Sequence, residues 1–266
     1  MKIGNREFDL THKGYIMGIL NVTPDSFSDG GSYTQVELAV AHALDMVKDG
    51  ADIIDVGGES TRPGHGTVTA EEEIKRVIPV IEALAKVVDV PISIDTSKAE
   101  VARQAVMAGA ALINDVWGAK RDPEIARVAA ELDVPICLMH NRENMEYEHF
   151  IQDMKDDLAE SVNICLTAGV KPENIMLDPG VGFAKTLDHN LEVMKSLEQF
   201  LELGYPILLG TSRKSMIGLA LDLPVGERLE GTIATTVVGF MRGCRIFRVH
   251  DVKENLRALK MTEYMI

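Results

Sequence analysis

The chain is short of cysteine, and this shortage excludes one class of protein. Among its 266 residues there are only three cysteines, Cys137, Cys165 and Cys244, which lie far apart within apolar segments. An odd number of cysteines without a CxxC pair argues against a disulfide framework and is typical of proteins in a reducing compartment. We therefore expect a cytoplasmic protein whose three thiols are reduced and buried.

The chain also lacks long apolar runs and an excess of basic residues. No segment approaches the roughly 20 apolar residues of a membrane-spanning helix, and residues 1–10 do not resemble a signal peptide. There are 27 Lys and Arg against 41 Asp and Glu, which gives a formal net charge of -14. Because such a charge repels polyanions, we expect neither nucleic acid nor a membrane as a partner.

One unit of helix followed by strand recurs along the sequence. An amphipathic stretch ends, usually at glycine, and a short β-branched run follows that finishes in a polar residue. Seven such joints lead into DIIDV, PISID, ALIND, PICLMH, NIMLD, PILLGTS and CRIFRVH, and the earlier run YIMGILN supplies an eighth strand. Strands that are apolar on both faces and alternate with helices predict a parallel sheet covered by helices.

Eight such units favour a single (β/α)8 TIM barrel, because a barrel of about 250 residues would use nearly the whole chain. We expect one domain over residues 1–266, since no linker, low-complexity tract or change in composition divides the sequence. A doubly wound open sheet is the alternative, although it rarely needs eight strands. Residues 1–10 are expected to form a short extra strand or hairpin at the bottom of the barrel.

Helix boundaries have their own sequence signals. The spacing of a capping box, in which two side chains satisfy the unpaired amides of a helix start, occurs at Thr34 and Glu37, Thr69 and Glu72, Ser97 and Glu100, and Asp251 and Glu254. Glycines at positions 50, 109, 169, 204 and 243 are predicted to end helices in the left-handed conformation that other residues avoid.

All eight predicted strands finish in polar residues. These residues are Asn21, Asp55, Asp95, Asn114, His140, Asp178, Thr211 with Ser212, and Arg248 with His250. The C-terminal ends of barrel strands build the active site, so these side chains are expected to meet in one mouth. Any one of them could simply mark the end of the core. As a set they indicate a binding site, because burying carboxylates and amides is costly unless they have a partner.

The loops at two places in the predicted barrel also favour a binding site. The first two strands are followed by VTPDSFSDGGSY and GGESTRPGHGTVT, whose length and composition are typical of lids or binding loops. Barrels frequently bind phosphate with the loops after strands seven and eight. In this acidic chain, that corner contains the basic side chains Arg213, Lys214, Arg248 and His250. We therefore expect an anionic ligand there.

Seven segments together resemble the dihydropteroate synthase family. They are GILNVTPDSFSDGG (18–31), DVGGESTRPG (55–64), IDT (94–96), INDV (113–116), LDPGVGFAK (177–185), SRKS (212–215) and RVHD (248–251). The resemblance runs nearly from end to end in the same order. It implies a (β/α)8 barrel that joins 6-hydroxymethyl-7,8-dihydropterin diphosphate to 4-aminobenzoate, with release of diphosphate, to make 7,8-dihydropteroate for folate synthesis.

The resemblance also implies a role for each residue that matches a family motif. The residues that match the family's pterin-binding positions are Asp95, Asn114, Asp178 and Lys214. The residues expected to bind the diphosphate are Thr61, Arg248 and His250, and the residue expected to bind the Mg²⁺ cofactor is Asn21. The residues expected to bind 4-aminobenzoate are Phe27, Thr61, Arg62, Pro63, Phe183 and Ser215. The groups expected to act in catalysis are Asp95, Lys214, Arg248 and His250.

Two further expectations follow from the family, and the contacts of one loop are left open. Its members commonly form homodimers through late helices, and the apolar run 233–241 is compatible with that, although core burial explains the run equally well. The aminobenzoate position implies sulfonamide binding. The chain departs from many relatives after His140, where it reads NRENMEY in place of a glycine-containing turn, so the contacts of that loop are left open.

Two alternatives keep the same barrel and pterin pocket. A pterin-dependent methyltransferase would retain the acidic and amide residues but would not need the SRKS and RVHD segments. A non-catalytic pterin-binding paralogue would lack the Mg²⁺ and diphosphate residues, whereas Asn21, Arg248 and His250 are all present. With no nucleophile beside an activating base in the sequence, we expect a dissociative substitution without a covalent enzyme intermediate.

Overall fold

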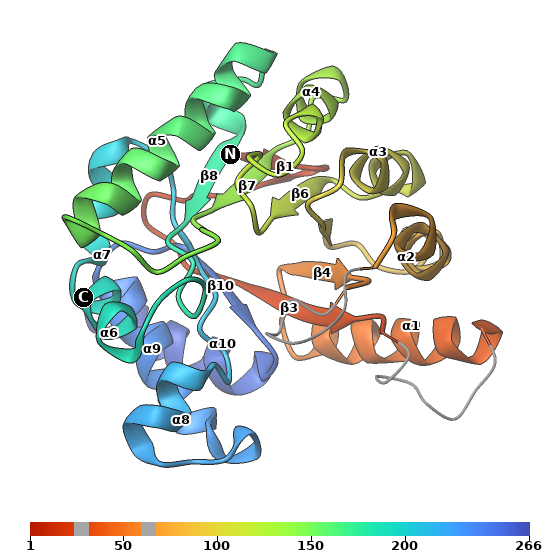
Figure 1. Ribbon diagram of the computed structural model, residues 1–266. Coiled ribbons are helices and arrows are strands. Elements are labelled where there is room, and N and C mark those ends of the chain that lie inside the picture. Colours follow the sequence, from red (N-terminus) through yellow and green to blue (C-terminus); the bar gives the residue numbers. More distant parts are fainter. Residues whose placement is uncertain (24–31, 60–67) are drawn as a thin grey trace.

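The computed structural model describes residues 1–23, 32–59 and 68–266, whose parallel strands form a barrel surrounded by helices (Figure 1). The eight parallel strands of this described part are β3 (Tyr15–Asn21), β4 (Ile53–Gly57), β5 (Ile92–Asp95), β6 (Leu112–Asp115), β7 (Ile136–Met139), β8 (Ile175–Asp178), β9 (Leu208–Leu209) and β10 (Ile246–Val249). Their order is β8-β7-β6-β5-β4-β3-β10-β9. A parallel bridge between Leu177 and Ile207 joins the two ends of the sheet. The prediction of a (β/α)8 TIM barrel is therefore confirmed.

Helices connect the strands and cover the outside of the barrel (Figure 1). They are α1 (Ser32–Lys48), α2 (Ala70–Leu84), α3 (Ala99–Ala108), α4 (Glu124–Glu131), α5 (Phe150–Ala168), α6 (Leu187–Lys195), α7 (Leu197–Phe200), α8 (Ser215–Leu221), α9 (Leu229–Met241) and α10 (Val252–Glu263), with 3₁₀ turns η2 (Pro172–Asn174), η3 (Leu201–Leu203) and η4 (Val225–Glu227). The five glycines predicted to end helices all have positive φ, from 82° at Gly204 to 123° at Gly109.

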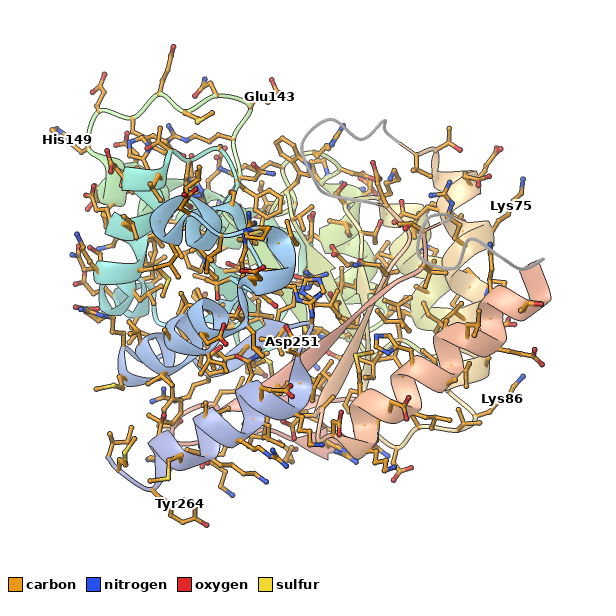
Figure 2. All side chains as sticks on the ribbon, turned by 90° about the horizontal axis from the view of Figure 1, so that it is seen from below. Lys75, Lys86, Glu143, His149, Asp251 and Tyr264 are labelled. Carbon is orange, nitrogen blue, oxygen red and sulfur yellow. The ribbon has the colours of Figure 1, made fainter. Side chains whose placement is uncertain are left out.

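Two apolar clusters fill the molecule. The larger one lies between strands and helices, where side chains such as Val77, Ile81 and Leu84 of α2 are fully buried. The free cysteines 137, 165 and 244 are all buried, as expected. Charged residues such as Lys75 and Lys86 project from the outer surface (Figure 2). Among the described residues, the helices are all too short or too polar to span a membrane.

The second cluster fills the barrel interior at its N-terminal end. A hairpin of β1 (Lys2–Ile3) and β2 (Arg6–Glu7) pairs antiparallel ahead of the barrel. Ile3 and Phe8 are buried against the inward side chains of the strands, namely Met17, Ile53, Leu112, Cys137, Met176, Leu208 and Ile246. The expected N-terminal hairpin is thus confirmed, and it closes the end of the barrel opposite the mouth.

The capping signals were right at one helix and wrong at another. The side chain of Thr69 accepts a hydrogen bond from the backbone N–H of Glu72 at 3.2 Å, as the spacing predicted. Thr34 was expected to precede a helix but lies inside α1, which begins at Ser32. A capping box therefore located the start of α2, whereas the same spacing at Thr34 misplaced the start of α1.

At two other helix starts, a residue distant in sequence changes the predicted cap. Ser97 does not cap α3, because the carboxylate of Asp122 accepts the backbone N–H of Ala99 at 2.8 Å. Asp251 does precede α10, but its side chain makes no capping bond. Its carboxylate instead accepts hydrogen bonds from Arg213 at 3.0 and 2.5 Å. These partners belong to other strand-and-helix units, so local spacing could not predict them.

We expect Thr69→Ala to lower the free energy of unfolding by about 1 kcal/mol, because it removes the cap of α2. The matched control is Thr34→Ala, which should change stability by less than about 0.5 kcal/mol, since Thr34 is exposed inside a helix where alanine is favourable. Urea denaturation of both variants measures the difference. Equal losses would contradict the assignment of Thr69 as the cap.

Candidate active site

The polar mouth of the barrel lies one layer above its apolar bottom. Residues two apart in a strand face the same side. The bottom layer contains one buried residue from each of β4, β6, β8 and β10, namely Ile53, Leu112, Met176 and Ile246. Two positions further along these strands lie Asp55, Asn114, Asp178 and Arg248. Parallel pairing also aligns Gly57 with Asp95 and Asp95 with Asn114 across β4, β5 and β6. Strand periodicity and register thus bring the predicted polar residues together at the C-terminal end.

Arg248 lies between two buried carboxylates at the centre of this mouth. Its Nε donates to Asp55 Oδ2 at 2.6 Å and its Nη2 donates to Asp95 Oδ2 at 2.7 Å. Asn114 Nδ2 lies 3.4 Å from the same oxygen of Asp55. Burial raises the pKa of Asp95, and the guanidinium of Arg248 opposes that shift. Burial alone would lower the pKa of Arg248, but the two carboxylates outweigh it and raise the pKa.

Asp178 and Lys214 form the adjoining part of the mouth. Asp178 Oδ1 accepts the backbone N–H of Gly180 at 2.7 Å. Burial raises the pKa of Asp178, while the ammonium of Lys214 opposes the shift. Burial lowers the pKa of Lys214 to about 8, against the attraction of Asp178. A Cβ atom on Gly210 would lie 3.6 Å from Asp178 Oδ2 and 3.9 Å from Arg248 Cβ, so glycine there keeps the space between these two residues open.

Asn21 ends β3 beside the same group of residues. A Cβ atom on Gly57 would lie 3.8 Å from Asn21 Oδ1 and 3.6 Å from Asp95 Oδ2, so both oxygens border the position that glycine leaves empty. In the described part of the chain there is no cluster of three or more His, Cys, Asp or Glu side chains able to hold a metal. A metal ion here would therefore rely on few protein oxygens and on its substrate. That is the usual way in which Mg²⁺ binds.

The basic corner predicted after β9 and β10 is only partly as expected. Ser212 Oγ lies 2.9 Å from Nδ1 of His250 and accepts its backbone N–H at 3.1 Å. This pair ties the loop after β9 to the end of β10. Arg213 does not join the mouth through its charge, because its guanidinium pairs with Asp251. The expected cluster of four basic side chains is thus reduced to Lys214, Arg248 and His250.

The remaining predicted residues differ in their placement. The Phe183 ring contacts Lys214, whose Nζ lies 4.6 Å from the ring centroid. Ser215 is exposed and is the first residue of α8, directly after Lys214. The predicted substrate residues of the first two loops lie outside the described residues; they are Phe27, Thr61, Arg62 and Pro63.

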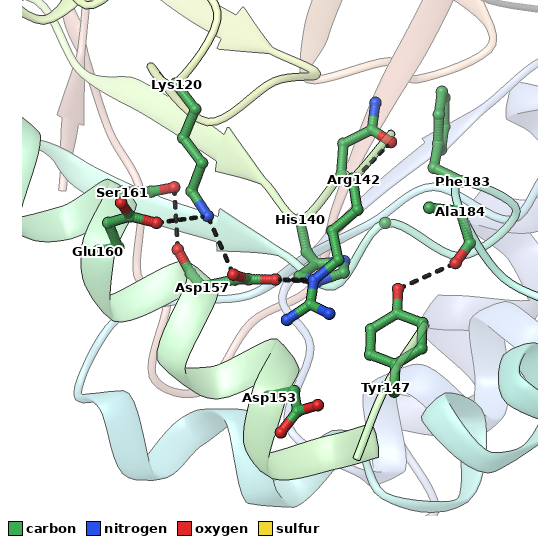
Figure 3. Close-up of polar contacts among 12 residues, drawn as sticks. Lys120, His140, Arg142, Tyr147, Asp153, Asp157, Glu160, Ser161, Phe183 and Ala184 are labelled. Carbon is green, nitrogen blue, oxygen red and sulfur yellow. Dashed lines mark hydrogen bonds and ion pairs between the residues drawn. The ribbon is translucent and has the colours of Figure 1, made fainter. Parts of the chain in front are cut away.

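Sequence reasoning missed four residues that shape the mouth. Asp55 and His140 were noted only as strand ends, and Lys185 only as part of a motif, yet all three are buried and hydrogen-bonded at or beside the site. The two-residue strand period above Ile53 would have indicated Asp55. Asp157, which binds His140 from α5 (Figure 3), has no local signal because a charged residue on a helix is usually solvent-facing.

Comparison with known proteins identifies the group to which this site belongs. Residues 17–250 match the model of the pterin binding enzyme family. A dihydropteroate synthase from Clostridium beijerinckii is 61% identical over 267 residues, covering 100% of this chain and 99% of that protein. The dihydropteroate synthase structure from Clostridium difficile in the presence of pteroic acid is 53% identical with a TM-score of 0.95, covering 97% and 99% of the two chains.

A third relative has the same fold at lower sequence identity. The dihydropteroate synthase of Xanthomonas albilineans, solved with 4-aminobenzoic acid, has a TM-score of 0.91 at 42% identity and covers 95% of this chain and 93% of its own. The family match begins at Met17, the third residue of β3, and ends at His250, which follows β10. From the shared fold and identity along its length, we conclude that this chain belongs to the dihydropteroate synthases, a family of pterin binding enzymes.

Proposed function

We propose that this chain is a transferase that condenses 6-hydroxymethyl-7,8-dihydropterin diphosphate with 4-aminobenzoate, giving 7,8-dihydropteroate and diphosphate. One observation carries the proposal: a mouth in which Asp95 and Asp178 lie beside Arg248 and Lys214, in a chain 61% identical to a dihydropteroate synthase. The reaction separates positive from negative charge. A site with both signs in a buried setting suits that change.

The pterin half is assigned to the acids and amide of the barrel mouth. A pterin edge presents adjacent N–H donors and a carbonyl acceptor. Asp178 and Asn114, both buried on neighbouring parts of the mouth, can pair with such an edge, and Lys214 can donate to its acceptor atoms. A hydrogen bond to a charged group contributes roughly 1.5 to 3 kcal/mol, so two or three such bonds would select this heterocycle.

The diphosphate half is assigned to Arg248, His250 and Thr61. As the C–O bond to diphosphate breaks, negative charge grows on the leaving oxygens and positive charge grows on the pterin methylene. Asp95 would stabilise the cation, and the basic groups would stabilise the leaving group. Ser212 Oγ lies 2.9 Å from His250 Nδ1, and this contact ties the histidine to the loop that follows β9.

The residues at the end of β3 fit a magnesium ion. The amide oxygen of Asn21 and the nearby carboxylate of Asp95 are the hard oxygen donors that Mg²⁺ prefers, and the ion usually keeps waters and substrate phosphate in its shell. When bound, Mg²⁺ would supply positive charge to the diphosphate. The protein's own contribution is then to orient the pterin and the leaving group against each other.

The 4-aminobenzoate half is assigned to Phe183 and Ser215 with the loop residues Phe27, Thr61, Arg62 and Pro63. The aniline nitrogen would attack after the leaving group has largely departed, so the substitution is dissociative and needs no enzyme nucleophile. The same position would accept sulfonamides, which resemble aminobenzoate.

We also propose that the protein is a homodimer that uses α9. The apolar run 233–241 lies in this helix, and core burial was one explanation of it. Two of its residues, Val238 and Met241, are however 39% and 63% exposed. Exposed apolar residues of this size on one helix end favour a protein contact over solvent. A second copy of the chain would cover them in the way expected for the family.

The proposed activity is tested by incubating the purified protein with both substrates and Mg²⁺ and measuring diphosphate release. We expect Lys214→Ala to lower kcat/KM by about tenfold to a hundredfold, because one charge-assisted contact to the pterin is lost. Lys75→Ala is the control, since Lys75 is exposed on α2. Unchanged kinetics for Lys214→Ala would remove this lysine from the site, and a wild-type protein without diphosphate release would refute the activity.

For the metal, we expect Asn21→Ala to raise the Mg²⁺ concentration needed for pterin diphosphate binding by about tenfold, since one of its few protein ligands is lost. Calorimetric titration at several Mg²⁺ concentrations measures this without turnover. Asn174→Ala, at a surface contact with Asp133, is the control. An unaltered Mg²⁺ dependence would show that Asn21 does not bind the ion.

For the dimer, we expect Met241→Glu to convert a two-chain species into a monomer, because the charge would be buried in an apolar interface. Met107→Glu on α3 is the matched control, as Met107 is 76% exposed and lies outside the proposed contact. Sedimentation velocity at several protein concentrations gives the oligomeric state. A monomeric wild-type protein, or a dimer in both variants, would contradict the use of α9.

A further inference from the structure

The loop after β8 contains a tight turn that includes one proposed substrate residue, Phe183, and contacts another, Lys214. In this turn, residues 180–183, the N–H of Phe183 donates to the carbonyl oxygen of Gly180 at 3.1 Å. The ammonium of Lys214 donates to the carbonyl of Val181 and lies over the Phe183 ring. The position of the turn therefore determines where the pterin lysine and the aminobenzoate phenylalanine lie relative to each other.

The backbone of this loop needs support to keep its shape. Gly180 and Gly182 have φ of 66° and 88°, and Ala184 has φ of 47°. The left-handed conformation costs a residue with a Cβ atom roughly 1 to 2 kcal/mol, so Ala184 would not adopt it unaided. Two side chains assist: the hydroxyl of Tyr147 donates to the Ala184 carbonyl at 2.9 Å (Figure 3), and Asn190 Oδ1 accepts the Gly182 N–H at 2.6 Å.

Lys185 supplies the central support. Its buried ammonium donates to the carbonyl oxygens of Gly180 at 3.0 Å and Phe183 at 2.9 Å, and it lies 2.9 Å from Nδ1 of His140. An ammonium has three donors, so these contacts use all of them. Two of the three end on the turn itself. Lys185 thus joins both ends of the turn to the end of β7.

His140 transmits this contact to a helix outside the barrel. The carboxylate of Asp157 is ionised and can only accept, so the hydrogen of the His140 ring lies on Nε2 and Nδ1 accepts from Lys185. Nε2 then donates to Asp157 Oδ2 of α5 at 3.0 Å. Burial lowers the pKa of His140 to about 4, which agrees with a neutral ring.

Asp157 is held in turn by two cations from the loops that follow β6 and β7. Arg142 Nε donates to Asp157 Oδ2 at 2.5 Å, and Lys120 Nζ lies 3.3 Å from Oδ1 (Figure 3). Burial would raise the pKa of Asp157, but the bonds from His140 and Arg142 outweigh it and hold the pKa well below its usual range. The loop NRENMEY, whose contacts were left open by the sequence, provides both Arg142 and Tyr147.

We propose that Lys185, held by His140 and through it by Asp157, is a positioning residue that fixes the turn 180–183 and thereby places Phe183 and Lys214 for the transfer reaction. This inference rests on the proposed function of the mouth. Two of the three donors of Lys185 bind the turn that carries Phe183 and contacts Lys214. Burial, which lowers the pKa of Lys185 to about 7, makes the arrangement costly in itself.

The consequence should appear in substrate affinity. Displacement of a positioning contact by about 1 Å can cost a reaction up to about a hundredfold, even when no reacting group is removed. Release of the turn would move the Phe183 ring first, since its own carbonyl is bound by Lys185. We therefore expect the KM for 4-aminobenzoate to rise more than kcat falls, whereas simple loss of folded protein changes the apparent kcat alone.

The test compares Lys185→Met, which keeps the aliphatic stem but removes the ammonium, with a pair of variants at His140. His140→Leu removes both hydrogen bonds, while His140→Gln retains one acceptor and one donor. We expect Lys185→Met and His140→Leu to raise the KM for 4-aminobenzoate about tenfold and His140→Gln to raise it less than about threefold. Lys171→Met, at an exposed pair with Asp133, should leave KM unchanged.

A double variant tests whether the residues act as one chain. If Asp157 acts through His140 on Lys185, then Lys185→Met combined with Asp157→Asn should be no worse in KM than Lys185→Met alone, since coupled residues are not additive. Wild-type KM in Lys185→Met and His140→Leu, with only Tm lowered, would overturn the proposal. Equal effects of leucine and glutamine at position 140 would overturn it as well. If Lys185→Met fails to fold, the His140 pair and Asp157→Asn decide the matter.

Hydrogen exchange separates this inference from the proposed activity. Mass spectrometry of the peptide covering residues 178–186 should show lost protection in Lys185→Met and Asp157→Asn and none in Lys171→Met, whatever the substrates of the protein are. A wild-type protein without diphosphate release would refute the activity and leave this measurement to decide the positioning role. Unaltered protection in all variants would refute the positioning role even in an active enzyme.

Discussion

The contact of Arg248 with Asp55 and Asp95 is the interaction on which the barrel mouth depends. The guanidinium lies between two buried carboxylates on adjacent strands and donates a hydrogen bond to each of them. Removal of one partner of a buried ion pair typically costs 3 to 5 kcal/mol, because the remaining charge is left uncompensated. Asp55 Oδ1 already has no hydrogen-bond partner among the described residues. The mouth is therefore costly in stability, as expected of a site built for ligands.

The mouth contains residues that project from paired strands and residues that come from loops. The loop residues need contacts from other elements to fix their positions. Asp55, Asp95 and Arg248 project from strands whose backbone is paired on both sides, so their positions follow from the sheet. Lys214 and Phe183 come from loops, and their positions follow from side-chain contacts such as those of Lys185. The contrast explains why buried hydrogen bonds surround the loop after β8, since a loop has no ladder of its own to fix it.

Local sequence patterns predicted the elements well where the deciding contacts are local. The strand runs and the helix-ending glycines depend on apolar burial and on φ, which each segment determines for itself, and all of them occur as expected. Capping failed at Ser97, where the carboxylate of Asp122, 23 residues away from Ala99, takes the helix amide. The fold likewise gives Arg213 a partner that the sequence did not indicate, as Asp251 binds its guanidinium. A competing partner brought by the fold outweighs a weak local preference.

The sequence by itself determined the barrel, the end at which its polar residues gather and the family resemblance, because repeated apolar runs admit few packings and strand ends of a parallel barrel share one face. Only the tertiary structure decided which of those residues touch. It placed Asp55 against Arg248 over a separation of 193 residues and brought Asp157 from a helix to the buried ring of His140. Such pairings depend on strand stagger and on how helices lie over the sheet, and these are properties of the closed barrel that no segment contains alone.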